Sequence, residues 1–205
     1  MRNKAIRNIL IGMSILLFTF LTVSFNTSLP DVTVKNQSYQ VRYSQELEQP
    51  LEVLYRVKCN KNSKEHYSRS GLNFYKIALV HTSDDKDYYK NEWDKGHMAP
   101  AAAFNCDYAE LKLSFSYVNC ALQHQDLNRG PWKDLEAYEK ELASNNEVTI
   151  RIYVDFVGSS RLTTGAMVPV GFTKVISLNG KLFKSYYFPN KSVSGNFENY
   201  LLKKY

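Results

Sequence analysis

The sequence has few of the residues on which disulfide-rich and zinc-bound folds depend. Only three of its 205 residues are cysteines. Cys59, Cys106 and Cys120 allow at most one internal disulfide if the protein is exported, with three alternative pairings. No two of them have the spacing of a zinc knuckle. The pattern therefore favours buried or singly paired cysteines over a metal site.

The sequence also lacks internal repeats and low-complexity tracts. Its hydrophobic content of 44% and charged content of 22% are ordinary for globular proteins, which excludes a disordered chain and a polytopic membrane protein. Without a leader, about 180 residues remain, which is the size of one compact domain with one core. Composition therefore predicts one domain without identifying its function.

The N-terminus differs in kind from the rest of the chain. Arg2, Lys4 and Arg7 precede an apolar run from Ile9 to Phe25. We predict that residues 1–25 are a secretory signal peptide, which makes the mature protein secreted or extracytoplasmic. The run of about 17 residues is near the lower limit for a membrane-spanning helix, so an uncleaved anchor is one alternative, with the membrane contacted only through this segment. A mitochondrial leader is the other, although such leaders are amphipathic.

The part of the chain after the leader is only mildly basic. Residues 26–37 are polar and predict a linker, followed by a domain at residues 38–205. The leader carries three of the 26 basic residues and none of the 20 acidic ones, which lowers the net charge from +6 to about +3. This balance is compatible with a polyanionic substrate but is too common to identify one.

The first half of the domain is predicted to be rich in strands. Tyr39–Tyr43 alternates, and Leu51–Val57 is rich in strand-forming residues, so we expect these two strands to pair. Lys58–Gly71 is polar and shows little periodicity. Phe74–Val80 is predicted as a further strand.

The second half combines one helix with several strands. Apolar residues recur at near-helical spacing from Trp132 to Leu142, behind Pro131. Strict alternation over Val148–Phe156 predicts a strand with one buried face. Two more strand-like runs, between Phe172 and Phe188, flank Asn179-Gly180, a strong hairpin signal. The sequence therefore predicts an α+β fold with antiparallel strands around at least one helix.

Three segments contain the residues that point to chemistry. They are residues 93–102 (WDKGHMAPAA), 118–123 (VNCALQ) and 127–136 (LNRGPWKDLE). Together they resemble the DNA/RNA non-specific endonuclease family of ββα-metal, or His-Me finger, nucleases of the endonuclease G type. The hallmarks of that family are Asp-Arg-Gly-His followed by Met/Leu-Ala-Pro, an Asn shortly before Pro-Gln, and an Asn-x-Gly-x-x-Trp-x-x-Leu-Glu helix start. Several blocks in the right order make coincidence improbable.

The resemblance covers most of the chain after the leader, and three positions depart from it. It implies a ββα-metal nuclease fold with a central antiparallel sheet, DNA and RNA as substrates, and Mg²⁺ as the cofactor, with Mn²⁺ as the alternative. Lys95 replaces the usual Arg, Leu122 replaces the Pro before Gln, and Gly130 is differently spaced. Lysine keeps the charge but lacks the planar fork that grips a phosphate, so we expect an effect on efficiency rather than reaction type.

Phosphodiester hydrolysis explains why these residue types are needed. A base must deprotonate water, a cation must offset charge on the phosphate, and the leaving oxygen needs a proton. His97 is the predicted base, because a neutral imidazole accepts a proton near neutral pH. His66, His81 and His124 lack such a context, and Asp94 is expected to hold the local turn.

The resemblance assigns the remaining site residues. Asn128 matches the family residue whose amide oxygen holds Mg²⁺, and Mg²⁺ tolerates so sparse a site because it retains most of its water. Glu136 is predicted to orient a water that protonates the leaving oxygen. It lies eight residues further on, about 12 Å along if the whole span is helical. Asn119 matches a residue near the metal, with a turn asparagine as the alternative.

Two other classes of function remain open from sequence. One is a catalytically weak or inert nucleic-acid-binding module on the same fold, which the exchange at Lys95 favours and the retained His97 argues against. The other is a membrane-anchored interaction protein, which does not explain the ordered motifs. The sequence does not determine the physiological role or the oligomeric state.

Overall fold

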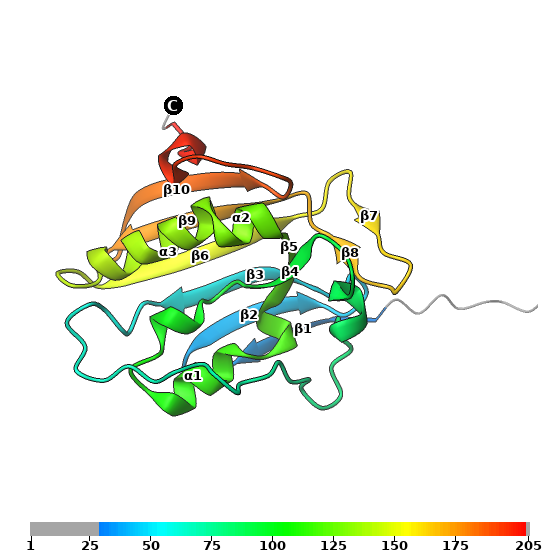
Figure 1. Cartoon of the computed structure of the whole chain (residues 1–205), viewed down its shortest axis with the longest axis horizontal. Coiled ribbons are helices and arrows are strands. Elements are labelled where there is room, and N and C mark those ends of the chain that lie inside the picture. Colours follow the sequence, from blue (N-terminus) through cyan, green and yellow to red (C-terminus); the bar gives the residue numbers. More distant parts are fainter. Residues whose placement is uncertain (1–28, 204–205) are drawn as a thin grey trace, which may run out of the picture.

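A six-stranded antiparallel sheet forms the centre of the protein (Figure 1). In spatial order its strands are β1 (Asp31–Lys35), β2 (Tyr39–Ser44), β3 (Gln49–Arg56), β6 (Val148–Asp155), β9 (Gly171–Leu178) and β10 (Lys181–Pro189). The computed structural model describes residues 29–203, so the predicted leader lies outside the described residues. The architecture confirms the predicted α+β fold with a central antiparallel sheet.

Alternating side chains explain why β6 lies in the middle of the sheet. Val148, Ile150 and Ile152 are fully buried on one face, and the strand pairs with both β3 and β9. Burial of each such side chain contributes about 1.5–3 kcal/mol. The β9–β10 hairpin turns at Asn179 and Gly180, whose φ values of 51° and 78° fit the left-handed turn that the sequence predicts.

A second, smaller ribbon and two helices complete the ββα arrangement. The ribbon pairs β4 (Trp93–His97) with β5 (Cys120–His124), and the helices are α2 (Gln125–Arg129) and α3 (Pro131–Leu142). Gly96 is required in β4 because a Cβ atom there would collide with the buried side chain of Gln123. The ribbon therefore brings His97 to its end, beside the helices.

Helix α3 is fixed against the sheet by its apolar face. Trp132 and Leu135 are fully buried, and the Trp132 ring meets Phe172 and Phe188 edge-on at centroid distances of 5.5 and 5.6 Å. Figure 1 shows α3 lying across β6 and β9, with α1 (Tyr108–Ser114) and the β4–β5 ribbon over the other half of the sheet. The two halves of this layer leave the candidate site between them.

A disulfide fastens the long polar stretch after β3. Cys59 and Cys106 are bonded, and Cys120 is free and buried. The Tyr67 amide also donates to the Asn105 carbonyl oxygen at 2.6 Å. The polar stretch is thus held against the segment that follows β4. Two short strands, β7 (Ser160–Arg161) and β8 (Met167–Val168), form a separate pair, and no helix within residues 29–203 is long and apolar enough to cross a membrane.

Two expectations from sequence differ from the structure. Part of the predicted linker forms β1, because Val32 and Val34 alternate with polar residues and the strand pairs with β2. Phe74–Val80 forms no strand: Tyr75 makes a single bridge to Ser116, and Leu79 has a φ of 64°, which ends any extended run.

The span from Asn128 to Glu136 is also not one continuous helix. Gly130 has φ −106° and ψ −118°, which separates α2 from α3, and Pro131 begins α3. A Cβ atom on residue 130 would lie 2.6 Å from the Asp126 carbonyl oxygen, so glycine suits the break. The separation expected for one continuous helix therefore does not apply, and both side chains still line the same pocket.

Candidate active site

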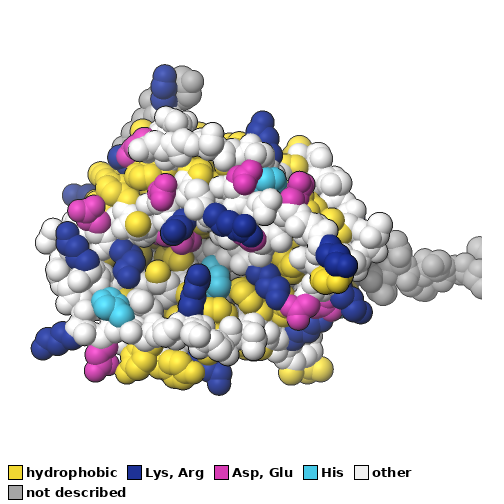
Figure 2. Space-filling view, viewed as in Figure 1, with side chains coloured by type: hydrophobic (Ala, Val, Ile, Leu, Met, Phe, Trp, Pro, Cys, Tyr) yellow, Lys and Arg dark blue, Asp and Glu magenta, His cyan; other side chains and the backbone are white. Residues whose placement is uncertain are grey.

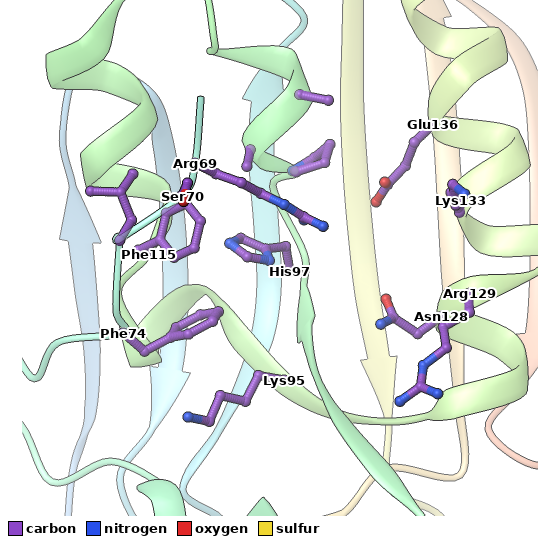
Figure 3. A pocket seen from close by; sticks show the side chains of 14 residues that line it. Arg69, Ser70, Phe74, Lys95, His97, Phe115, Asn128, Arg129, Lys133 and Glu136 are labelled. Atoms are coloured by element: carbon purple, nitrogen blue, oxygen red, sulfur yellow. The ribbon is translucent and has the colours of Figure 1, made fainter. Parts of the chain in front are cut away.

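A pocket of about 830 Å³ separates α2 and α3 from the end of β4 and its neighbouring loops (Figure 3). It brings together four of the five predicted site residues: Lys95, His97, Asn128 and Glu136. Its other lining side chains include three cations and two aromatic rings, namely Arg69, Arg129, Lys133, Phe74 and Phe115. Figure 2 shows a histidine at the bottom of a hollow, with dark blue cationic side chains around it.

His97 is held at the end of β4 between two phenylalanine rings. Its ring centroid lies 4.8 Å from that of Phe74 and 4.8 Å from that of Phe115. Burial, reinforced by the positive charge of Arg69, lowers the pKa of His97 to about 3. The imidazole is therefore neutral at physiological pH, and within residues 29–203 its buried Nε2 has no hydrogen-bond partner. A neutral imidazole is the form that can accept a proton, and the same burial that keeps it neutral also weakens it as a base.

The orientation of the Asn128 amide is set by Asp94. The Asn128 Nδ2 atom donates to the Asp94 carboxylate at 2.9 Å. Arg129 donates to the same carboxylate from Nε at 2.8 Å and from a terminal nitrogen at 2.7 Å. An ionised carboxylate only accepts, so the amide nitrogen must face Asp94 and the amide oxygen is left for the pocket. The hydrogen bonds to Asn128 and Arg129 also lower the pKa of Asp94 against the opposing effect of burial, which is the largest influence.

The amide oxygen of Asn128 fits the cofactor that the resemblance implies. Mg²⁺ prefers oxygen ligands and commonly keeps several waters, which one amide oxygen and a pocket of about 830 Å³ allow. Across the part of the chain that the structure describes, no cluster of three His, Cys, Asp or Glu residues is arranged to hold a metal. Asn128 offers such an ion one amide oxygen, and water would supply the remaining ligands.

Glu136 approaches the pocket from α3, opposite His97 (Figure 3). Burial raises the pKa of Glu136 to about 7, and Glu139 adds to this shift. The positive charge of Lys174 is the largest influence that opposes it. The carboxyl group thus changes its charge near neutral pH, a property that favours proton transfer or the orientation of water.

Lys95 lines the pocket but is already engaged by other groups. Its ammonium forms an ion pair with Asp85, whose carboxylate also accepts from the Tyr117 hydroxyl at 2.6 Å. The same nitrogen lies 5.6 Å from the ring centroids of Phe74 and Tyr117 and 5.8 Å from that of Tyr88. In Figure 3 it points away from Asn128. The positive charge of Lys95 is therefore held at the edge of the pocket, beside Asp85.

Asn119 is not among the residues that line the pocket. It is fully buried. Its Oδ1 accepts from the Ala99 amide at 2.8 Å, and its Nδ2 donates to the carbonyl oxygens of Ala99 and Ser114 at 2.8 and 2.9 Å. The Asn119 amide is therefore engaged in three hydrogen bonds to backbone groups. The structure therefore places Asn119 outside the pocket lining, where its side chain fixes the chain just after His97.

Three cations of the pocket were missed by the sequence reasoning. Arg69 lies in the polar stretch that shows no periodicity, so only its three-dimensional position brings it over His97. Arg129 and Lys133 lie inside the motif segment, and Lys133 precedes Glu136 by three residues, so helical spacing was a usable signal for it. The other histidines, His66, His81 and His124, do not line this pocket. His124 caps α2 by accepting from the Asp126 amide at 3.2 Å.

Comparisons with known proteins agree on one family. The sequence profile described as DNA/RNA non-specific endonuclease matches residues 18–205. The mitochondrial nuclease EXOG of Danio rerio is 36% identical over 66 residues, which are 32% of this chain and 19% of that protein. Mitochondrial endonuclease G of Bos taurus is 26% identical over 150 residues, which are 62% of this chain and 49% of that protein. The chain thus spans half or less of these curated relatives.

A solved structure shows the same fold. The structure of the EndoG/EndoGI complex, which concerns inhibition of EndoG, contains a chain that superposes with a TM-score of 0.70 at 23% sequence identity. The match covers 86% of this chain and 82% of that one. At this identity the likeness establishes the fold alone, and it agrees with the ββα-metal arrangement predicted from sequence.

Proposed function

Because the chain belongs to the DNA/RNA non-specific endonuclease family, we propose that it is a metal-dependent nuclease that hydrolyses phosphodiester bonds of DNA and RNA. One observation supports this most directly. A neutral His97, the amide oxygen of Asn128 and the carboxyl group of Glu136 line one pocket, which also holds four cationic side chains. A base, a place for a divalent cation and a binding surface for phosphate thus coincide.

Each group has a distinct task in this proposal. His97 accepts a proton from the water that attacks phosphorus. A divalent ion held by Asn128 would supply a Lewis acid next to the phosphate. Glu136, when ionised, accepts a hydrogen bond from a water and turns it toward the leaving oxygen. Arg69 and the other cations of the pocket bind the phosphate and offset its charge.

The same geometry supports a nuclease that is indifferent to base sequence and to the sugar. The polar groups of the pocket are cations, amides and carboxylates suited to phosphate, metal and water. Phosphate contacts position a nucleic acid without reading its bases. We therefore propose that both DNA and RNA are cleaved.

We propose that the protein works outside the reducing cytosol. The Cys59–Cys106 bond supports this, because disulfides persist mainly in oxidising compartments. The mitochondrial names of the two relatives support delivery to mitochondria as an alternative to secretion. Cell fractionation with N-terminal sequencing distinguishes these routes. A cytosolic protein that still begins at Met1 contradicts both of them.

The activity is tested with the purified protein and with His97→Ala. The wild type should nick plasmid and degrade RNA with Mg²⁺, and a chelator should stop both. His97→Ala should lose most cleavage while binding to uncleavable DNA stays nearly unchanged, because cations elsewhere contact the phosphates. His66→Ala, outside the pocket, is the matched control. Near wild-type cutting by His97→Ala contradicts the mechanism, and binding without any cutting by the wild type favours the inert module.

A further inference from the structure

A fully buried ion pair lies beneath the helix that carries Glu136. Lys174, in the middle of β9, has 0% of its side chain exposed, and Glu139 has 1%. The Lys174 Nζ atom lies 3.0 Å from the Glu139 Oε1 atom. Replacing such a pair with apolar residues is often neutral or stabilising, so stability alone is a weak reason for its presence.

The pair is tied to two further elements of the fold. The Tyr55 hydroxyl on β3 donates to the second oxygen of Glu139 at 2.8 Å. The Lys174 ammonium lies 3.9 Å from the centroid of the Trp132 ring on α3. Both charges are thereby held in one place relative to α3 and the sheet.

Glu139 follows Glu136 by one helical turn, so the buried pair lies close to the pocket. The groups that act on the Glu136 carboxyl come from several elements. Glu139 and the indole of Trp132 lie on α3 with it, and Lys174 lies on β9. Tyr55 on β3 and Arg69 in the polar stretch after β3 complete the set. Lys174 favours the ionised carboxylate, and Glu139 opposes it. Lys174 is the largest of the influences that counter the burial of Glu136.

We propose that Lys174 is a positioning residue for Glu136, with its buried ammonium favouring the ionised form of that carboxylate at the pocket wall. Glu139, anchored by Tyr55, holds the ammonium in place and limits its effect. This inference rests on the proposed function of Glu136. It adds that the working charge of the site is set from inside the core, by a residue that does not line the pocket.

The test measures Glu136 directly in the metal-free full-length protein. Carbon-13 labelled glutamate gives a carboxyl signal for Glu136, which Glu136→Gln identifies by its loss. Lys174→Met removes the favourable charge, so the titration midpoint of Glu136 should rise by about one pH unit. Glu139→Gln keeps an acceptor for Tyr55 and leaves the lysine charge, so the midpoint should fall. The double variant should lie between the two single variants.

A matched control separates charge from packing. Ile176 is fully buried two residues along β9, on the same face as Lys174. Ile176→Ala should lower stability without moving the Glu136 midpoint. Unchanged midpoints in Lys174→Met and Glu139→Gln overturn the inference, as does an equal movement in Ile176→Ala. If Lys174→Met does not fold, the downward shift in Glu139→Gln and the double variant decide the matter.

Activity provides a second and separable measurement. With Mg²⁺ present, the acid side of the pH–rate profile should move upward in Lys174→Met and downward in Glu139→Gln. Opposite shifts of the Glu136 titration midpoint in Lys174→Met and Glu139→Gln support the electrostatic link, whatever the activity of Glu136→Gln. Cleavage by Glu136→Gln at the wild-type rate contradicts only the role of Glu136 in the proposed function. Failure of the inference and failure of the proposed function are therefore distinguishable.

Discussion

Single residues around the pocket determine how much of its positive charge is available to a phosphate. The Lys95 ammonium is paired with Asp85 and surrounded by aromatic rings. Lys95→Ala should weaken DNA binding, whereas Lys95→Arg should keep or raise activity, because the charge matters more than its shape. Asp85→Asn should strengthen DNA binding by about threefold, because it releases the ammonium from a partly exposed pair. Fluorescence titration with uncleavable DNA measures the affinities, and plasmid nicking measures the activity of Lys95→Arg. Equal affinities of Lys95→Ala and the wild type would remove Lys95 from the site.

Asp94 orients Asn128, the proposed metal ligand. Its carboxylate turns the Asn128 nitrogen away from the pocket. Asp94→Ala should raise the Mg²⁺ concentration needed for half-maximal cleavage by about tenfold, because outer partners orient a ligand. The maximal rate at saturating Mg²⁺ should fall much less, since His97 is retained. Asp134→Ala, an exposed acid on α3, is the control. An unchanged Mg²⁺ requirement in Asp94→Ala would show that the orientation of Asn128 does not depend on this hydrogen bond.

Among the elements, the break between α2 and α3 fixes the position of Asn128 relative to Glu136, the proposed metal ligand and the proposed water-orienting group. Gly130 separates the helices, and an added Cβ would meet the Asp126 carbonyl oxygen. Gly130→Ala should destabilise the fold by about 1–3 kcal/mol through overpacking. It should also weaken the response to Mg²⁺, because Asn128 shifts relative to Glu136. Urea unfolding and a Mg²⁺ titration measure the two effects. A loss of stability with an unaltered Mg²⁺ response would show that α2 tolerates the shift.

The elements that were predictable from sequence are those with a strong local pattern. The alternation that predicts β6 and the Asn179-Gly180 turn are both confirmed, because each depends on neighbouring residues. Phe74–Val80 has strand-forming residues, but Phe74 packs against His97 instead of entering a ladder. That choice depends on tertiary contacts, which a local pattern does not contain.

The same limit applies to the candidate site. The motif order brought His97, Asn128 and Glu136 into consideration, since these lie in recognisable segments. Arg69 lies outside these segments. Its place in the pocket depends on the disulfide and on the backbone hydrogen bonds that hold its loop. Lys174 lies in the middle of an otherwise apolar strand face, where its sequence neighbours give no indication of the ion pair beneath α3. The positions of both residues can be recognised only in the assembled fold.

For the molecule as a whole, the net charge contributes less to substrate binding than the local arrangement of cations. The chain after the predicted leader is only mildly basic, yet Arg69, Lys95, Arg129 and Lys133 share one pocket. Counterion release depends on the phosphates that a protein contacts rather than on its net charge. The molecule therefore combines a nearly balanced surface with one concentrated site.

Burial of Glu136 should make the whole protein less stable as the pH rises. Its folded pKa of about 7 exceeds the ordinary value of 4.5. Between these values the folded protein retains a proton that the unfolded chain releases, so stability falls as pH rises from 4.5 to 7 and the loss persists above that. Glutamine carries no such proton. Glu136→Gln should thus gain stability relative to the wild type as pH rises, by about 2 kcal/mol at pH 8 after allowance for partial exposure.

His97 does not obscure this comparison, because its lowered pKa affects both proteins equally and acts in the opposite direction. A folded pKa of about 3 against an ordinary 6.5 means that its contribution is lost as pH falls below 6.5. The difference between Glu136→Gln and the wild type therefore isolates the carboxyl group. Urea unfolding with a chelator at pH 5 and pH 8 measures it, with Asp134→Asn as a surface control. A difference that is the same at both pH values would mean that Glu136 titrates as an ordinary exposed glutamate, and that its ionisation carries no stability cost.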